Sequence, residues 1–272
     1  MKNISAEGCI TELTPTLCTL FGVKLPARST ENCISSVMDY AQKTLDGEKV
    51  EKALIYAPDG IGNILFEKYP EMFAGLAGAA PLRTLLRTVM PSVTPVCFGS
   101  MFSGALPEVH GIMEYSKPVL SCDTVFDVFP AASKKVAIVS NTQCSIDMIF
   151  RSRNVDYFSF MEGLRPCEFT GYLLEKYDYD LIICYNPIYD SVMHKTSTDS
   201  PEALAACAKS VELFVHLTEI FNRRWKSKNR MSVFAPDHGA HNNEDGRGTH
   251  GKDIPEDMLV NHFYRVAKGS LN

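Results

Sequence analysis

The stretch MPSVTPVCFGSMFSGALPEVHGI, residues 90–112, sets the question that the rest of the chain answers. It is too apolar for a surface loop, and its prolines and glycines interrupt it too often for an ordinary core helix. Thr94 stands directly before Pro95, and proline fits the first turn of a helix, where an N–H group would have no intrahelical partner. We therefore predict a buried helix over 94–104 that begins at a threonine hydroxyl.

Five short segments elsewhere have the composition of buried strands. They are rich in β-branched or aromatic residues and apolar at consecutive positions, as strands covered on both faces are. Helical patterns lie between them, the longest over 201–225. This alternation predicts an α/β fold in which a mostly parallel sheet lies between helices. The predicted strands cover 52–57, 134–140, 154–160, 180–185 and 230–235, and the other predicted helices cover 10–21, 31–46, 144–151 and 166–176.

Composition narrows the class of partner and the compartment. The 272 residues carry a formal net charge of −5 without a long basic run, which argues against a nucleic-acid groove or an anionic membrane as the main partner. No window approaches the roughly 18 apolar residues of a membrane span, and the first residues lack the apolar core of a secretory signal. Nine cysteines without a CxxC pair fit reduced thiols. We expect one cytoplasmic domain over 1–272, because no repeat or linker divides the chain.

Acidic and histidine residues follow three of the five predicted strands. In doubly wound sheets the ligand binds outside the carboxyl ends of the strands, at one edge. Aspartate and histidine side chains that gather there can hold a divalent transition metal, with zinc the usual occupant. The candidate ligands are Asp59 after the first strand, Asp190 and His194 after the fourth, and Asp237, His238 and His250 after the fifth.

Six ligands exceed what one tetrahedral site uses, and they suffice for two adjacent sites if Thr94 adds a seventh. Paired metal ions about 3.5–4 Å apart hold the attacking and leaving oxygens of a phosphoryl displacement. The amino end of a helix favours a phosphate anion, and a hydroxyl activated there can attack phosphorus. This predicts Thr94 as a nucleophile, and it gives the helix at 94–104 a reason to be buried beneath the sheet edge.

Each element also has a purely structural explanation. Alone, an Asp-Gly pair is a common turn, a Thr-Pro pair is usually a helix cap, and Asp and His four residues apart can pair on a helix surface. Their joint occurrence at strand ends and at one helix start favours a site instead. Four other histidines are expected not to bind metal, with His216 a packed core residue of its helix; the four are His110, His216, His241 and His262.

Four blocks of the chain, in the family's order, resemble the nucleotide pyrophosphatase/type I phosphodiesterase family of the alkaline phosphatase superfamily. The resemblance covers roughly residues 50–265 and includes the Asp59-Gly60 pair after the first strand. It implies an alkaline-phosphatase-like three-layer α/β/α sandwich with a mostly parallel central sheet. The blocks are PSVTPVCFGSMFSGALPEVHGI with Thr94 as the nucleophile, DSVMH with Asp190 and His194, PDHGA with Asp237 and His238, and GTHG with His250.

The resemblance also implies a mechanism and two metal ions. Thr94 would attack a phosphate ester in line and form a phosphothreonine, which water then hydrolyses. Zinc is the expected ion because three of the ligands are histidines, and Mn²⁺ or Mg²⁺ are the alternatives. The ligand sets that it implies are Asp190, His194 and His250 for one ion, and Asp59, Thr94, Asp237 and His238 for the other.

The chain departs from the family's pattern at three positions. Cys97 stands where the family has an asparagine that contacts a phosphate oxygen, and a thiol is a poor hydrogen-bond donor. We keep Cys97 as a candidate substrate contact. Tyr189 and Met193 replace a proline and a glycine of the block around Asp190. Contacts to the transition state and the choice of substrate therefore do not carry over from the resemblance.

The two ends of the chain indicate a rearranged order of elements. In the superfamily the GTHG block leads into a helix of the pattern D-x-x-P-T-x-x-x-L-x-G-x-x-x-P, which instead resembles residues 10–26, ITELTPTLCTLFGVKLP. We hypothesise a circular permutation that moved this element to the front. The hypothesis predicts that 10–26 packs beside the sheet, next to a helix at 255–268, with the chain termini close together.

The leading hypothesis is a metal-dependent hydrolase of small phosphate esters, either a phosphodiesterase of the nucleotide pyrophosphatase kind or a phosphomonoesterase. A sulfatase or phosphonate hydrolase on the same core is the alternative enzyme, although the C/S-x-P-x-R motif of sulfatases does not occur around Thr94. A catalytically degenerate metal-binding protein is the non-enzymatic alternative. Cys97 favours it, and the complete ligand set opposes it.

Overall fold

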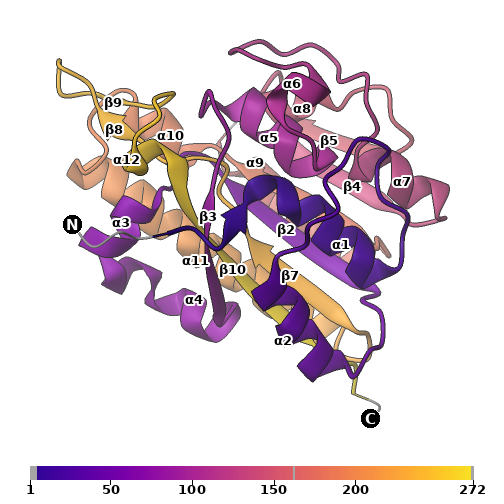
Figure 1. Ribbon diagram of the computed structural model, residues 1–272. Helices are drawn as coiled ribbons and strands as arrows, with labels where there is room; N and C mark the ends of the chain where they lie inside the picture. Colours follow the sequence, from indigo (N-terminus) through magenta and orange to yellow (C-terminus); the bar gives the residue numbers. More distant parts are fainter. Residues whose placement is uncertain (1–4, 162, 271–272) are drawn as a thin grey trace.

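A mixed sheet lies at the centre of the protein (Figure 1). The structure is a computed structural model that describes residues 5–161 and 163–270. Among the described residues the sheet has eight strands. Strand β10 runs antiparallel to both its neighbours, and every other pair is parallel. In spatial order the strands are β1 (Gly8–Cys9), β3 (Leu82–Arg87), β10 (Leu259–Ala267), β7 (Arg230–Phe234), β2 (Lys52–Pro58), β6 (Leu181–Asn186), β4 (Val136–Asn141) and β5 (Asp156–Phe160).

Side chains of the central strands alternate between two hydrophobic clusters. Ala53 and Ile55 of β2 belong to one cluster, and Leu54 and Tyr56 belong to the other. Successive residues of a strand point to opposite faces, so a run that is apolar at every position is buried on both sides. This confirms the prediction of a sheet covered by helices on both faces.

The cluster on one face is covered by helices that come mostly from the first half of the chain. In Figure 1, α1 and α2 cross in front of the sheet. The short 3-10 helix η1 (Ile10–Glu12) leads into α1, and α6 (Pro107–His110) follows α5. The helices of this face are α1 (Leu13–Phe21), α2 (Ser35–Leu45), α5 (Thr94–Ser103), α7 (Val125–Ala131) and α8 (Ser145–Ile149).

The opposite face is covered mainly by the long helix α11, which passes behind the sheet in Figure 1. A further group of short elements lies near the carboxyl ends of β2 and β7: a second, two-stranded sheet of β8 (His241–Asn242) and β9 (Gly248–Thr249), and α12 (Pro255–Met258). The elements of the second face are α3 (Asn63–Lys68), η2 (Pro70–Phe73), α4 (Ala74–Ala79), α9 (Arg165–Lys176), α10 (Ile188–Met193) and α11 (Pro201–Arg224).

All five predicted strands are present, but the prediction of a helix over 255–268 is wrong. Only 255–258 is helical, and 259–267 is β10. Its polar residues Asn261 and His262 are buried in the sheet, which hides the apolar pattern of the strand. Asn261 donates to the Asn63 side chain at 2.7 Å, and the His262 Nε2 atom bonds to the Pro236 carbonyl at 2.9 Å. Strands β1 and β3 were not predicted either.

The segment proposed as a permuted element forms η1 and α1. These pack against α5, and α1 also packs against α2. Leu13 and Leu17 share one hydrophobic cluster with Val260 and Tyr264 of β10. The permutation itself stays a prediction, as does the single domain over 1–272, and the expected closeness of the termini concerns residues outside the described ranges.

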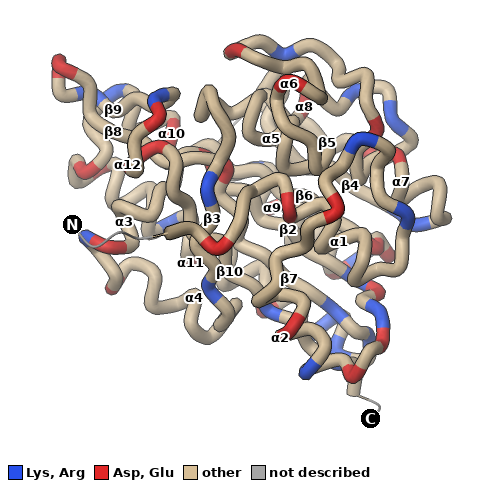
Figure 2. The backbone as a smooth tube through the Cα atoms, viewed as in Figure 1, with Lys and Arg blue, Asp and Glu red and all other residues tan. Residues whose placement is uncertain are grey.

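Acidic and basic residues are scattered along the backbone trace of the described residues in Figure 2, and this view shows no continuous stripe of one sign. Among the described residues, none of the helices combines the length and the apolar character that crossing a membrane requires.

Candidate metal centre

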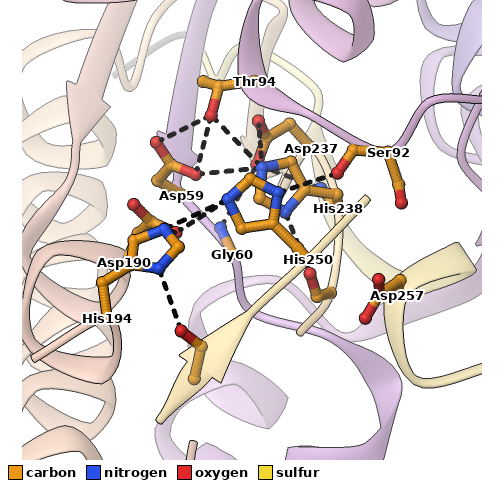
Figure 3. A network of polar contacts seen from close by, with 12 residues as sticks. Asp59, Gly60, Ser92, Thr94, Asp190, His194, Asp237, His238, His250 and Asp257 are labelled. Atoms are coloured by element: carbon orange, nitrogen blue, oxygen red, sulfur yellow. Dashed lines mark hydrogen bonds and ion pairs between the residues drawn. The ribbon is translucent and has the colours of Figure 1, made fainter. Parts of the chain in front are cut away.

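The structure brings the six predicted ligands together at the carboxyl edge of the sheet, where they form two groups (Figure 3). In each group one ligand atom from every residue lies within 4.8 Å of the others. Each ligand is delivered by the end of a strand or by the first helix after one. The buried group is Asp59 after β2 with Asp237 and His238 after β7, and the outer group is Asp190 and His194 of the α10 turn after β6 with His250 after β9.

Thr94 faces the buried group from the first residue of α5. Its hydroxyl oxygen lies 3.4 Å from both carboxylate oxygens of Asp59 and 3.2 Å from His238 Nε2. Val93, rather than Thr94, is the N-cap residue, and no side chain caps the helix. The Thr94 hydroxyl is therefore not used for capping and is free to face the carboxylate.

Short distances also join the ligands within each group. In the buried group, His238 Nε2 lies 3.3 Å from Asp59 Oδ1 and 3.4 Å from Asp237 Oδ2. In the outer group, Asp190 Oδ1 lies 3.3 Å from His194 Nε2 and 3.5 Å from His250 Nε2. The two imidazole Nε2 atoms of the outer group are only 3.2 Å apart.

Backbone carbonyls fix the tautomer of the three histidines that belong to the two groups. The Nδ1 atoms of His238, His250 and His194 lie 2.9, 2.9 and 3.0 Å from the carbonyl oxygens of Gly239, Ser92 and Gly248. A carbonyl only accepts, so Nδ1 carries the proton and the lone pair of Nε2 points at the carboxylates. This arrangement of a second hydrogen bond behind the ligand is typical of histidines that bind metal ions.

The carboxylates of the two groups lie close together, and a bound cation would offset their mutual repulsion. Burial, together with the charges of Asp237 and Asp190, raises the pKa of Asp59 well above its usual range. Burial raises the pKa of Asp237 to about 6, and burial beside His238 lowers the pKa of His250 to about 3. Burial also acts to raise the pKa of Asp190, but the neighbouring imidazoles of His194, His238 and His250 outweigh it and lower that pKa.

Two buried carboxylate oxygens, one in each group, have no hydrogen-bond partner among the described residues. They are Asp237 Oδ2 and Asp190 Oδ1. An unpaired buried carboxylate oxygen is costly, since its desolvation is not repaid. The orphaned oxygens, the facing Nε2 lone pairs and the mixed Asp and His ligand set all fit a divalent cation in each group.

Close backbone contacts shape the loop that carries His250. A Cβ atom at Gly248 would lie 2.7 Å from the carbonyl oxygen of Met193 and 2.4 Å from its sulfur. Only glycine therefore lets this loop approach the end of α10. Met193, which stands where the family has a glycine, packs directly against the glycine of the GTHG block.

A cleft of about 510 Å³ opens beside both groups. Lys117 is the only lysine or arginine among its lining residues, and its amino group donates to the Gln143 carbonyl at 2.9 Å. The sequence does not predict the cleft wall, and its one signal for these residues is the nearness of Tyr115 and Lys117 to the PEVHGI block. Besides Asp59, Thr94, Asp190, His194 and His250, the lining residues are Val93, Tyr115, Lys117, Cys144, Ser145, Tyr185, Pro187, Ser191 and Thr249.

Cys97 does not line this cleft, which speaks against the expected contact with substrate. It is fully buried, and its sulfur accepts a hydrogen bond from the Thr88 hydroxyl at 3.2 Å. The fourth residue of a helix that begins at Thr94 points into the core here, because α5 is buried along its whole length.

The four histidines expected not to bind metal belong to neither group. His216 is exposed on α11, so its assignment as a packed core residue is wrong. His241 lies near the centre but bonds through Nδ1 to Asp257 Oδ1 at 2.7 Å. His110 and His262 are buried and hydrogen-bonded within the core.

Comparisons with known proteins support the fold. No protein-family model matches the chain, and no curated protein sequence matches it. Among solved structures, phosphonoacetate hydrolase from Sinorhizobium meliloti 1021 in complex with phosphonoacetate is 17% identical, with 72% of this chain and 59% of that chain covered and a TM-score of 0.53. Murine ectonucleotide pyrophosphatase/phosphodiesterase 5 in complex with AMP is 14% identical, with the same coverage and a TM-score of 0.57.

The zinc complex of the C-terminal periplasmic domain of EcEptC from Escherichia coli is also similar, at 11% identity over 84% of this chain and 75% of that chain, with a TM-score of 0.54. This chain spans less than two thirds of the first two structures, and identities this low bear on the fold alone. All three belong to the alkaline phosphatase superfamily. The chain therefore shares the α/β fold of these structures, with a mostly parallel sheet between helices, as the sequence predicts.

Proposed function

We propose that this protein is a hydrolase of small phosphate esters that works with two divalent metal ions and a phosphothreonine at Thr94. The observation that carries the proposal is the position of the Thr94 hydroxyl. It lies within 3.4 Å of Asp59 and His238, and it lines the same cleft as the outer group. A helix cap alone does not require a hydroxyl between a buried carboxylate and an imidazole.

The residues that would hold the ions follow from the two groups. Zinc is the ion that we propose, because three of the ligands are imidazoles, and Mn²⁺ and Mg²⁺ remain alternatives. When bound, a pair of divalent ions supplies positive charge for the attacking and leaving oxygens of a phosphoryl displacement. One ion would be held by Asp190, His194 and His250, and the other by Asp59, Thr94, Asp237 and His238.

The chain's own groups prepare Thr94 for attack. The Tyr185 hydroxyl donates to Asp59 Oδ2 and so orients this carboxylate beside the threonine. The amino end of α5 faces the incoming phosphate with the positive end of its dipole. In the first step the Thr94 oxygen bonds to phosphorus as the ester P–O bond breaks, and the proton that Thr94 gives up ends on the oxygen of the departing alcohol. Water then cleaves the Thr94–phosphate bond, which restores the threonine hydroxyl and releases phosphate, or a phosphate monoester where the substrate is a diester.

Phosphonates are a second candidate substrate class. Lys117 is the cation of the cleft wall, and phosphonoacetate, bound in one of the similar structures, carries a carboxylate beside its phosphorus. A lysine at the cleft wall suits such a second negative charge.

The nine cysteines support our further proposal that the protein works in the reducing cytoplasm.

The test compares p-nitrophenyl phosphate, bis- and alkyl p-nitrophenyl phosphates and phosphonoacetate, using metal-stripped protein refilled with zinc or manganese. Thr94→Ser keeps the hydroxyl and serves as the matched control for Thr94→Ala. We expect metal-dependent turnover that Thr94→Ala loses and Thr94→Ser keeps in part. Two bound ions without turnover of any of these compounds would favour a degenerate metal-binding protein.

A further inference from the structure

Two neighbouring loops carry three of the six ligands, and they belong to different groups. The loop after β7 holds Asp237 and His238 of the buried group, and the loop after β9 holds His250 of the outer group. A two-residue ladder, β8 with β9, joins these loops through two residue pairs. Such a short ladder is a weak means of fixing the distance between two metal groups.

Asp257 bonds to both loops from within α12. Its side chain is fully buried, and Figure 3 shows it beside the two loops. Its Oδ1 accepts a hydrogen bond from the ring of His241 at 2.7 Å, and its Oδ2 accepts from the backbone N–H of Lys252 at 2.8 Å. Its backbone carbonyl accepts from the N–H of Gly239, also at 2.8 Å.

The three contacts fall close to the ligands in sequence. Gly239 is the residue after His238, and Lys252 follows His250 by two residues. Asp257 thus spans the two loops near a ligand of each group: its carboxylate contacts His241 and Lys252, and its backbone carbonyl contacts Gly239. Hydrogen bonds that end on an ionised carboxylate are stronger than those between neutral groups, so the link is stiff.

The packing around α12 leaves little freedom for this link to shift. A Cβ atom at Gly239 would lie 2.0 Å from the carbonyl oxygen of Glu256, so the loop lies directly against the residue before Asp257. The carbonyl of Met258 accepts from the N–H of Thr88 at 2.8 Å, and the Thr88 hydroxyl donates to the Asp237 carbonyl at 2.6 Å. Asp257 is therefore held from both sides.

We propose that Asp257 is a positioning residue that sets the two metal groups relative to each other, a role that rests on the proposed two-metal function. It touches neither substrate nor metal. It acts through His241 and Lys252 on the loops that hold His238 and His250, so the pair of sites binds two ions at full affinity only when this carboxylate bridges the loops.

The test measures metal binding by the full-length, metal-stripped protein, with Zn²⁺ followed by calorimetry and Co²⁺ by visible absorption. Asp257→Ala removes the bridge, and Asp257→Asn keeps an acceptor for the Lys252 N–H. Asp180→Ala is the matched control, because Asp180 accepts from the Lys135 N–H at 2.8 Å and from Lys52 at 3.0 Å, before the amino end of β6. We expect Asp257→Ala to weaken ion binding about 10- to 100-fold and to change the Co²⁺ band.

Asp257→Asn should lose less affinity than Asp257→Ala, and Asp180→Ala should lower thermal stability while binding two ions as the wild type does. A purely structural role would give Asp257→Ala the behaviour of Asp180→Ala, which would overturn the inference. If the wild-type protein itself binds no ion, the proposed function fails and the inference fails with it. If the wild type and Asp257→Ala bind two ions equally, only the inference fails.

Discussion

The two ligand groups differ in how far they are withdrawn from water. In the buried group the side chains of Asp59, Asp237 and His238 are at most 3% exposed. In the outer group the His194 side chain is 40% exposed. An unpaired charge destabilises the folded protein strongly where water is excluded and only weakly where water can solvate it. The buried group should therefore depend on its ion for stability, while the outer group can exchange its ion with solvent.

The largest effect is expected at Thr94, which belongs to the buried group. Thr94→Ala should lower kcat by on the order of 10³-fold or more, because removing a member of a catalytic unit costs about as much as removing the unit. Metal analysis should still find the ion of the outer group. Turnover of an ester by Thr94→Ala at the wild-type rate would show that another group attacks phosphorus.

Replacing one histidine in each group separates the two environments directly. In chelator-treated protein, His238→Ala should reduce the free energy of unfolding by about 3–5 kcal/mol, since removing a fully buried ring leaves a cavity. His194→Ala should change it by less than about 0.5 kcal/mol, as exposed substitutions usually do. Denaturant unfolding measures both values. Equal losses in the two variants would remove the distinction between the groups.

His262 tests what burial does to a histidine that has no carboxylate beside it. Burial lowers its pKa to about 4 from an ordinary value near 6.5. Between these pH values the unfolded chain binds a proton that the folded protein excludes. Stability that is complete above pH 6.5 should therefore fall as the pH drops towards 4, by about 3 kcal/mol. The difference in unfolding free energy between wild type and His262→Phe, followed against pH, isolates this contribution; a difference that does not vary with pH would contradict it.

The smallest effect is expected at Lys117, on the cleft wall outside both groups. Lys117→Gln should lower kcat/KM for phosphonoacetate about tenfold relative to p-nitrophenyl phosphate, which corresponds to roughly 1.4 kcal/mol. The ratio of the two substrates is the measurement, so a general loss of folded protein does not affect it. An unchanged ratio would mean that the lysine does not contact the carboxylate.

The sequence predicts those strands in which the buried positions carry few polar side chains. Strands β2, β6 and β7 are buried at nearly every position, and the ligands follow these strands directly because strand ends converge at one edge of the sheet. Strand β10 escaped prediction because Asn261 and His262 are paired through contacts with residues far away in the chain. The partners of a buried polar residue cannot be deduced from its neighbours in sequence.

In the candidate site, too, some residues can be predicted from local sequence patterns and others cannot. Its ligands stand at positions that local patterns mark, whereas Asp257 lies in a four-residue helix that no motif singles out. Lys117 and Tyr115 reach the cleft through a segment without regular structure after α6. Their roles depend on which loops meet in space, and a single sequence does not contain that information.

The wide spacing of the ligands along the chain has a consequence for folding. The first ligand, Asp59, follows β2, and the last, His250, comes after every parallel strand of the sheet. Contacts this distant in sequence form late, because closing a long loop costs entropy before the stabilising contacts can form. The centre therefore cannot nucleate the protein. Ion uptake should follow the collapse of the sheet and then lock it, so that metal ions slow unfolding much more than they speed refolding.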